Sequence, residues 1–375
     1  MNFDEIRPYR DHEVKEKISK LVEEEQFAQV VSYVNPEVPF EQIKGAMLQM
    51  GSIKAFQSKI IVPMLEQLIK KTTDGVEVDG LENLEKGKAY LFVSTHRDIV
   101  LDSAFMNYIL LREGHETAEI AIGDNLMKIP WIVDLVKLNK TFIVKRNVAK
   151  EDKVDASRQL SGYINETIKR TAESIWIAQR SGRSKDGNDH TNPSLIKMFN
   201  LMGESQHVLD NIKALNIVPV AISYEYNPCD VLTIPELMSL EKGEKYEKAP
   251  MEDMIHMAKG IEGDKGKVAV SFGKPLNHYL EDLKGLNNLN DLTVGIARKI
   301  DQEIYRVYHL MPTNYIAWDL LHASDQHSGH YEAEYKANFQ QYMENRIEEV
   351  EGDPEEVRKT FLSMYANPVE NSPKA

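Results

Sequence analysis

The sequence lacks any run of about 18 consecutive apolar residues, the length that a membrane-spanning helix requires. Its first residues, MNFDEIRPYRDHEVKEK, are charged, whereas a signal peptide has an apolar core near its start. We therefore expect any membrane contact to be peripheral.

Cysteine is nearly absent, and positive charge is in the minority. The single cysteine, Cys229, excludes an internal disulfide and fits a reducing compartment. The formal net charge of −14 argues against a protein that mainly binds nucleic acid. The remaining composition, 42% hydrophobic and 28% charged, is that of an ordinary globular protein.

One segment departs from the acidic character of the chain. Between Lys145 and Lys185 there are ten basic and five acidic residues, a local charge of +5. Such an island suits a small anionic ligand, because the rest of the surface repels polyanions. Solvent-exposed helix faces with mixed charges would produce the same count, so the island alone does not decide between these readings.

The middle of the chain alternates short apolar runs with helical patterns. The strand candidates are residues 76–80, 89–95, 119–123, 141–145, 174–179, 217–225 and 267–273. Helical periodicity falls between them, notably over 99–112, 125–137 and 151–171. This alternation predicts an α/β core with a mostly parallel sheet flanked by helices, and the first run, VEVDG, alternates like an edge strand.

Both ends of the chain have a different character. Residues 1–73 predict an N-terminal helical subdomain, with Pro63 as a kink or break. Residues 74–311 form the predicted core. Residues 312–375 predict a polar, helical C-terminal extension whose last ten residues, ANPVENSPKA, we expect to be frayed.

The segment STHRDIVLD carries the strongest chemical signal. An apolar strand ends just before His96, and Asp98 and Asp102 follow. Open α/β sheets place their sites at this end of their strands, and a carboxylate can orient a His that acts as a general base. His96 and Asp102 cannot share a helix face, so they can meet only if a turn separates them. The alternative is that the carboxylates only cap the helix.

Four blocks in order resemble the glycerol-3-phosphate and lysophosphatidate acyltransferase family. STHRDIVLD resembles the first block, in which four residues separate a His from an Asp. FIVKR (142–146) resembles the second, SGRSKDG (181–187) the third and IVPVAISYE (217–225) the fourth. VDGLENL (78–84) and VSFGKPL (270–276) agree with the flanks of this core.

The resemblance implies a role for each matching position. His96 would be the base and Asp102 its partner. The acceptor phosphate would bind Lys145, Arg146, Arg183, Ser184 and Lys185. Ser181 and Gly182 would form the loop near the oxyanion, and Val218 and Pro219 would line the acyl site.

The chain departs from the family pattern at two places. Five residues rather than four separate His96 from Asp102, which leaves Asp98 as a rival partner; we favour Asp102 because it begins the helix. In the third block, Ser181 stands at or beside the position of the family's acidic residue, and the loop is one residue shorter.

The resemblance implies an O-acyltransferase of phospholipid biosynthesis. It would move a fatty acyl group from acyl-CoA or acyl carrier protein to a hydroxyl of glycerol 3-phosphate, a lysophosphatidate or a similar lysolipid. No metal or bound cofactor is implied, and a cluster of His and Asp at 322–330 is interpreted as a solvated loop. We expect a cytoplasmic protein, peripheral on the inner face of the membrane. The competing hypothesis is a non-catalytic lipid- or anion-binding protein that retains the fold.

Overall fold

A computed structural model describes residues 1–373 except 35, 128, 147 and 287. Its centre is a seven-stranded sheet in the order β1-β7-β6-β2-β5-β3-β4. The strands are β1 (Val76–Asp79), β2 (Leu91–Ser94), β3 (Glu119–Gly123), β4 (Thr141–Val144), β5 (Ile175–Ala178), β6 (Ile217–Tyr224) and β7 (Val268–Phe272). Each matches a predicted run, and VEVDG supplies an edge strand as expected.

The sheet is mostly parallel, which confirms the predicted fold class. Strands β2 to β6 share one direction, while β7 pairs antiparallel with β6 and parallel with β1. Strands β2, β6 and β7 are buried throughout, because helices cover both faces of the sheet. The reversal of β1 and β7 at one side was not predicted.

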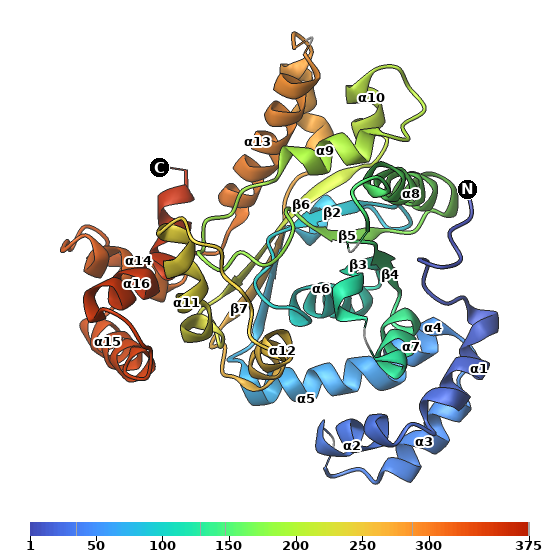
Figure 1. Cartoon of the computed structure of the whole chain (residues 1–375), viewed down its shortest axis with the longest axis horizontal. Coiled ribbons are helices and arrows are strands. Elements are labelled where there is room, and N and C mark those ends of the chain that lie inside the picture. Colours follow the sequence, from blue (N-terminus) through green and yellow to red (C-terminus); the bar gives the residue numbers. More distant parts are fainter. Residues whose placement is uncertain (35, 128, 147, 287, 374–375) are drawn as a thin grey trace.

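Alternation along β2 divides the core into two layers. Leu91 and Val93 pack with α8 (Lys153–Glu166), α9 (Pro193–Asn200), α10 (Val208–Lys213) and α13 (Leu289–Val307). Phe92 packs on the other face with α5 (Val62–Thr72) and α6 (Leu101–Arg112). These helices enclose the sheet between them (Figure 1).

The N-terminal helices form their own apolar cluster with α7 (Pro130–Leu138). They are α1 (Asp11–Leu21), α2 (Glu25–Val34), α3 (Phe40–Leu48) and α4 (Ile53–Phe56). A π-helical turn at Gln57–Ile61 leads from α4 into α5. Pro63 therefore lies just after the π-helical turn, and the helical backbone continues past it without a break.

The C-terminal helices pack together on the opposite side of the molecule from α1–α4 (Figure 1). They are α14 (Pro312–Leu321), α15 (Ala333–Ile347) and α16 (Pro354–Asn371), and they cover α11 (Asp230–Glu241). The prediction of a frayed tail is wrong for residues 366–371, because they complete α16 and bury Ala366 and Pro368. Residues 374–375 lie outside the described part.

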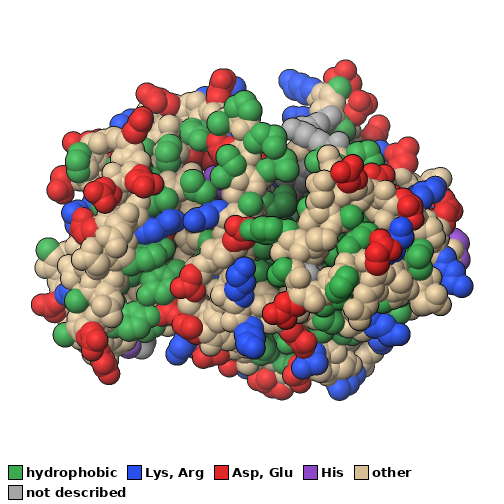
Figure 2. All heavy atoms as spheres, turned by 90° about the horizontal axis from the view of Figure 1, so that it is seen from below, with side chains coloured by type: hydrophobic (Ala, Val, Ile, Leu, Met, Phe, Trp, Pro, Cys, Tyr) green, Lys and Arg blue, Asp and Glu red, His purple; other side chains and the backbone are tan. Residues whose placement is uncertain are grey.

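Acidic and basic side chains are interspersed over the face seen from below (Figure 2). Helix α12 (Glu252–Glu262) lies beside α5 (Figure 1). Among the helices of the described residues, none has both the length and the apolar character needed to span a bilayer.

Candidate active site

His96 and Asp102 meet across the turn that follows β2. His96 Nδ1 lies 2.9 Å from Asp102 Oδ2. Thr95 extends the pairing of β2 with β6 through its Oγ1, which accepts from the N–H of Ile222 at 2.8 Å. Helix α6 begins at Leu101, so the residues between the pair form a turn and the two side chains can converge.

Four donors surround the Asp102 carboxylate. Oδ2 accepts from the backbone N–H groups of Arg97 at 2.7 Å and Asp98 at 3.0 Å, and Oδ1 accepts from the Tyr224 hydroxyl at 2.8 Å. Asp102 is 1% exposed, and these contacts satisfy a carboxylate that water cannot reach. Because a carboxylate oxygen can only accept, Nδ1 of His96 is the donor, which in the neutral imidazole leaves the lone pair on Nε2.

Asp98 has a different role from Asp102. Its Oδ1 accepts from the backbone N–H groups of Val100 at 2.8 Å and Leu101 at 2.7 Å, so it caps the start of α6. Burial raises the pKa of Asp98, and the neighbouring charge of Asp102 raises it further. The structure therefore pairs His96 with Asp102 and uses Asp98 to shape the turn.

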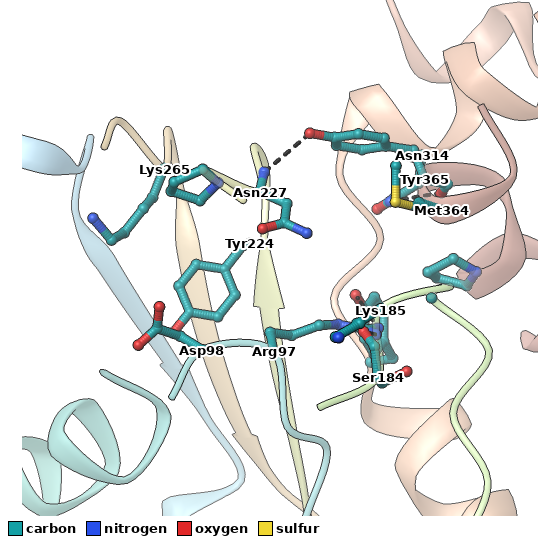
Figure 3. A pocket seen from close by; sticks show the side chains of 14 residues that line it. Arg97, Asp98, Ser184, Lys185, Tyr224, Asn227, Lys265, Asn314, Met364 and Tyr365 are labelled. Atoms are coloured by element: carbon teal, nitrogen blue, oxygen red, sulfur yellow. Dashed lines mark hydrogen bonds between the residues drawn. The ribbon is translucent and has the colours of Figure 1, made fainter. Parts of the chain in front are cut away.

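A loop after β5 packs directly against this turn. The backbone N–H of Ser184 donates to the carbonyl of His96 at 2.6 Å. The Arg97 guanidinium donates to the Ser184 carbonyl at 3.1 Å and pairs with buried Asp189 at 2.5 Å. Figure 3 shows the side chain of Arg97 extending toward Ser184 and Lys185. Arg97 thus ties the loop to the end of β2.

A cavity of about 500 Å³ opens beside His96. Its size is that of a small-molecule site. Strand β3 pairs with β5 only at Glu119–Ile175 and Ile120–Trp176, and later residues of both strands line the cavity. The cavity therefore enters the sheet where these two strands separate, at their C-terminal ends.

The cavity wall has a basic part and an apolar part. The basic side chains are Arg146, Arg180, Arg183, Lys185 and Lys248. The apolar ones come from both faces of the sheet and from α8 and α9, and include Ile120, Ile122, Trp176, Val144, Leu160, Leu195 and Met198. Two acidic side chains, Glu236 and Asp253, also line the cavity, and Glu236 pairs with Lys185. The wall thus has a charged part with more basic than acidic groups, and an apolar part.

Comparison with known proteins decides what kind of domain holds this cavity. Residues 75–223 match the family model described as Acyltransferase. Residues 75–223 are an acyltransferase-family domain. They contain His96, Asp102, and four of the five basic residues of the cavity wall.

A solved structure resembles the chain more loosely. The 1-acyl-sn-glycerophosphate (LPA) acyltransferase, PlsC, from Thermotoga maritima is 14% identical. The match covers 77% of this chain and 94% of that one, with a TM-score of 0.36. No curated protein matches the sequence.

The acyltransferase domain brings together most of the residues that the sequence singled out. His96, Arg146, Ser181, Gly182, Arg183 and Lys185 line the cavity, with Asp102 behind His96. Arg146 lies against Gly123, where an added Cβ would come within 2.8 Å of its Nε. Gly182 adopts a left-handed φ of +82°, which favours glycine at this turn of the loop.

Four predicted residues lie elsewhere, which corrects the expected site. Lys145 turns to the surface and pairs with Glu5 at 2.7 Å. Ser184 is buried on the Arg97 side of the loop, beside a second, small cavity. Val218 and Pro219 are buried within β6, where Val218 packs in the apolar layer that the sheet shares with α5 and α6, and neither residue lines the large cavity.

The loop cations have partners on α11 and α12. Arg183 donates to His256 Nδ1 at 2.7 Å, and Lys185 forms an ion pair with Glu236. Burial, together with the charges of Arg183 and Lys185, lowers the pKa of His256 to about 4. His256 is therefore neutral at pH 7 and can accept from Arg183 without adding positive charge.

Sequence reasoning missed Tyr224, Arg97 and Arg180 as site residues. A signal for Tyr224 was present, since period-2 alternation in β6 places it on the same face as Val220 and Ile222, toward α6. Nothing in the sequence pairs Arg97 with Asp189, which is 92 residues away.

The histidines near residues 322–330 are engaged with aromatic rings. His322 stacks on Trp318 and His330 on Tyr315. Across the described residues, no group of His, Cys, Asp and Glu side chains is arranged to hold a metal ion.

Proposed function

We propose that the protein transfers a fatty acyl group from a thioester donor to a hydroxyl of a phosphate-bearing glycerolipid acceptor. The observation that carries this proposal is the position of the His96–Asp102 pair. It faces a cavity with basic side chains on one part of its wall and apolar side chains on another. This combination fits an acceptor with an anionic head and a donor with an apolar chain.

The chemical step needs one general base and no covalent intermediate. His96 Nε2 takes the proton of the acceptor hydroxyl as its oxygen attacks the thioester carbonyl. The tetrahedral intermediate then collapses, the C–S bond breaks, and the imidazolium returns the proton to the departing thiolate. Asp102, held by Tyr224 and two backbone N–H groups, fixes the tautomer of the neutral imidazole and stabilises the imidazolium once it forms.

The basic residues would orient the acceptor. Arg146 and Arg180 follow β4 and β5, and Arg183 and Lys185 belong to the following loop. Guanidinium groups bind phosphate oxygens through charge-assisted hydrogen bonds. A phosphate fixed there would hold the hydroxyl near His96 and make the attack effectively intramolecular.

The apolar wall would hold the acyl chain. Leu160, Leu195 and Met198 replace Val218 and Pro219 in that role, because they line the same cavity as His96. Backbone N–H groups near Gly182 are candidate donors to the oxyanion. The donor would be acyl-CoA or acyl carrier protein, and the acceptor glycerol 3-phosphate, a lysophosphatidate or a related lysolipid. We propose a peripheral position on the inner membrane face as the place of this reaction.

The test is release of free thiol by the purified full chain. Acyl-CoA and acyl carrier protein are each offered with glycerol 3-phosphate, lysophosphatidate and a phosphate-free monoacylglycerol. The proposal predicts acceptor-dependent thiol release that is fastest with a phosphate-bearing acceptor. Binding of these lipids without any thiol release would favour the non-catalytic hypothesis.

A further inference from the structure

The C-terminal helix α16 holds the loop that carries Arg183 and Lys185. Asn367 donates from Nδ2 to the backbone carbonyl of Asp186 at 2.7 Å. The next residue, Gly187, has a φ of +72°, and an added Cβ would lie 2.1 Å from the Met364 carbonyl oxygen. The contact therefore requires glycine for both its backbone conformation and its close approach.

A proline in α16 explains why the Met364 carbonyl can face the loop. Pro368 lies inside the helix and has no N–H, so Met364 has no i+4 donor for its carbonyl oxygen. The Gly187 backbone packs against that oxygen. A small cavity of about 40 Å³ separates the rest of α16 from the loop, lined by Ser184, Lys185, Met364 and Tyr365 among others (Figure 3).

Helix α16 is itself fixed to the core through Asp230. This fully buried carboxylate accepts from the hydroxyls of Tyr342 at 2.8 Å and Tyr365 at 3.0 Å, and it pairs with Arg346. Asp230 begins α11, the helix that carries Glu236, the partner of Lys185. The C-terminal helices thus fix both the backbone of the loop and the helix that its lysine contacts.

We propose that α16 is a positioning element of the anion site, with Asn367 as its key residue. The loop has left-handed backbone at both Gly182 and Gly187, so without a clamp it would lose more conformational entropy on binding an anion. The Asn367 contact removes part of that cost and places Arg183 and Lys185 for a phosphate monoester. This proposal rests on the proposed function, which supplies the ligand.

The test compares Asn367→Ala with a matched control, Asn371→Ala, in the full chain. Asn371 lies one turn further along α16 and makes only an exposed contact to Asn188 at 3.2 Å. Inorganic phosphate and glycerol 3-phosphate are titrated calorimetrically, and melting temperatures are measured. We expect Asn367→Ala to bind phosphate about 5-fold more weakly, which is the effect of losing one positioning hydrogen bond. Asn371→Ala should bind phosphate as tightly as the unaltered chain.

The acceptor kinetics add a readout that a merely structural role would not change. We expect Asn367→Ala to raise KM for glycerol 3-phosphate while kcat stays within about twofold. A lower melting temperature with unchanged phosphate affinity would overturn the proposal. Arg183→Ala distinguishes phosphate recognition by the loop from the positioning of the loop by α16. If Arg183→Ala weakens phosphate binding and Asn367→Ala does not, only the role of α16 fails. If phosphate does not bind the unaltered chain, phosphate recognition fails in the proposed function and this inference fails with it.

Discussion

His96 Nδ1 and Asp102 Oδ2 lie 2.9 Å apart although five residues separate them in sequence. The turn between His96 and Asp102 contains the one residue more than the family pattern has. In this turn the carboxylates of Asp98 and Asp102 together accept four hydrogen bonds from backbone N–H groups. Asp102 takes those of residues 97 and 98, and Asp98 takes those of residues 100 and 101. The turn is therefore fixed at both ends by side chains that the sequence supplies locally.

Asp102 contacts His96 whereas Asp98 caps α6, so removing the charge of each carboxylate should lower activity to a different extent. Asp102→Asn should lower kcat by roughly 100-fold or more, because the amide can present a donor to Nδ1 and favour the wrong tautomer. Asp98→Asn keeps an oxygen for the two N–H groups and should cost less than about threefold. Steady-state thiol release measures both, and the reverse ranking would contradict the pairing.

Lys145 and Arg146, the two neighbouring cations of the second block, should differ in their effects on the acceptor, and Arg183 of the third block should behave like Arg146. Arg183→Ala and Arg146→Ala should each lower kcat/KM for a phosphate-bearing acceptor by roughly tenfold to a hundredfold, since each removes a charge-assisted contact. Lys145→Ala, which removes only a surface pair with Glu5, is the matched control and should change little. Equal effects of Arg146→Ala and Lys145→Ala at physiological salt would exclude a specific role for Arg146.

The raised pKa of Glu119, a residue that does not line the cavity, should make the stability of the fold depend on pH. Burial raises its pKa from 4.5 to about 7, and its Oε2 lies 2.5 Å from the Tyr163 hydroxyl. Between these two pH values the folded state holds a proton that the unfolded chain has released. The contribution of Glu119 to stability is therefore full below about pH 4.5 and is lost as the pH rises through 7.

Glu119→Gln removes this titration and leaves a neutral side chain. Relative to the unaltered chain, its free energy of unfolding should rise by on the order of 2 kcal/mol between pH 5 and pH 8. Urea unfolding at both pH values gives the difference. A mutational effect that does not change with pH would show that Glu119 is ionised in the folded state throughout this range.

The sequence predicted what local patterns determine. All seven strands follow from apolar runs, and α6, α7 and α8 follow from periodicity. The His96–Asp102 contact follows from a strand end, a turn and a helix start. The antiparallel direction of β7 did not follow, because strand direction depends on how distant segments pack. The helical end of the chain was missed because ANPVENSPKA contains two prolines and few apolar residues, whereas packing on α11 and α14 sustains α16 to Asn371.

The directions in which side chains point were the second feature that the sequence could not predict. Lys145 and Arg146 are adjacent after β4, and adjacent residues of an extended chain point to opposite sides. Only the three-dimensional arrangement shows that Arg146 enters the cavity while Lys145 reaches Glu5. In the same way, the Val218–Pro219 motif fits an acyl site by resemblance, but both residues are buried within β6 and neither lines the cavity.

The most direct test of the account is acceptor-dependent thiol release by His96→Ala. His96 is 17% exposed and packs little of the core, so the variant should keep its melting temperature and its affinity for inorganic phosphate. We predict that kcat falls by roughly 100-fold or more, the contribution expected of a general base. A folded His96→Ala protein with activity within about threefold of the unaltered chain would contradict the central claim that His96 is the base.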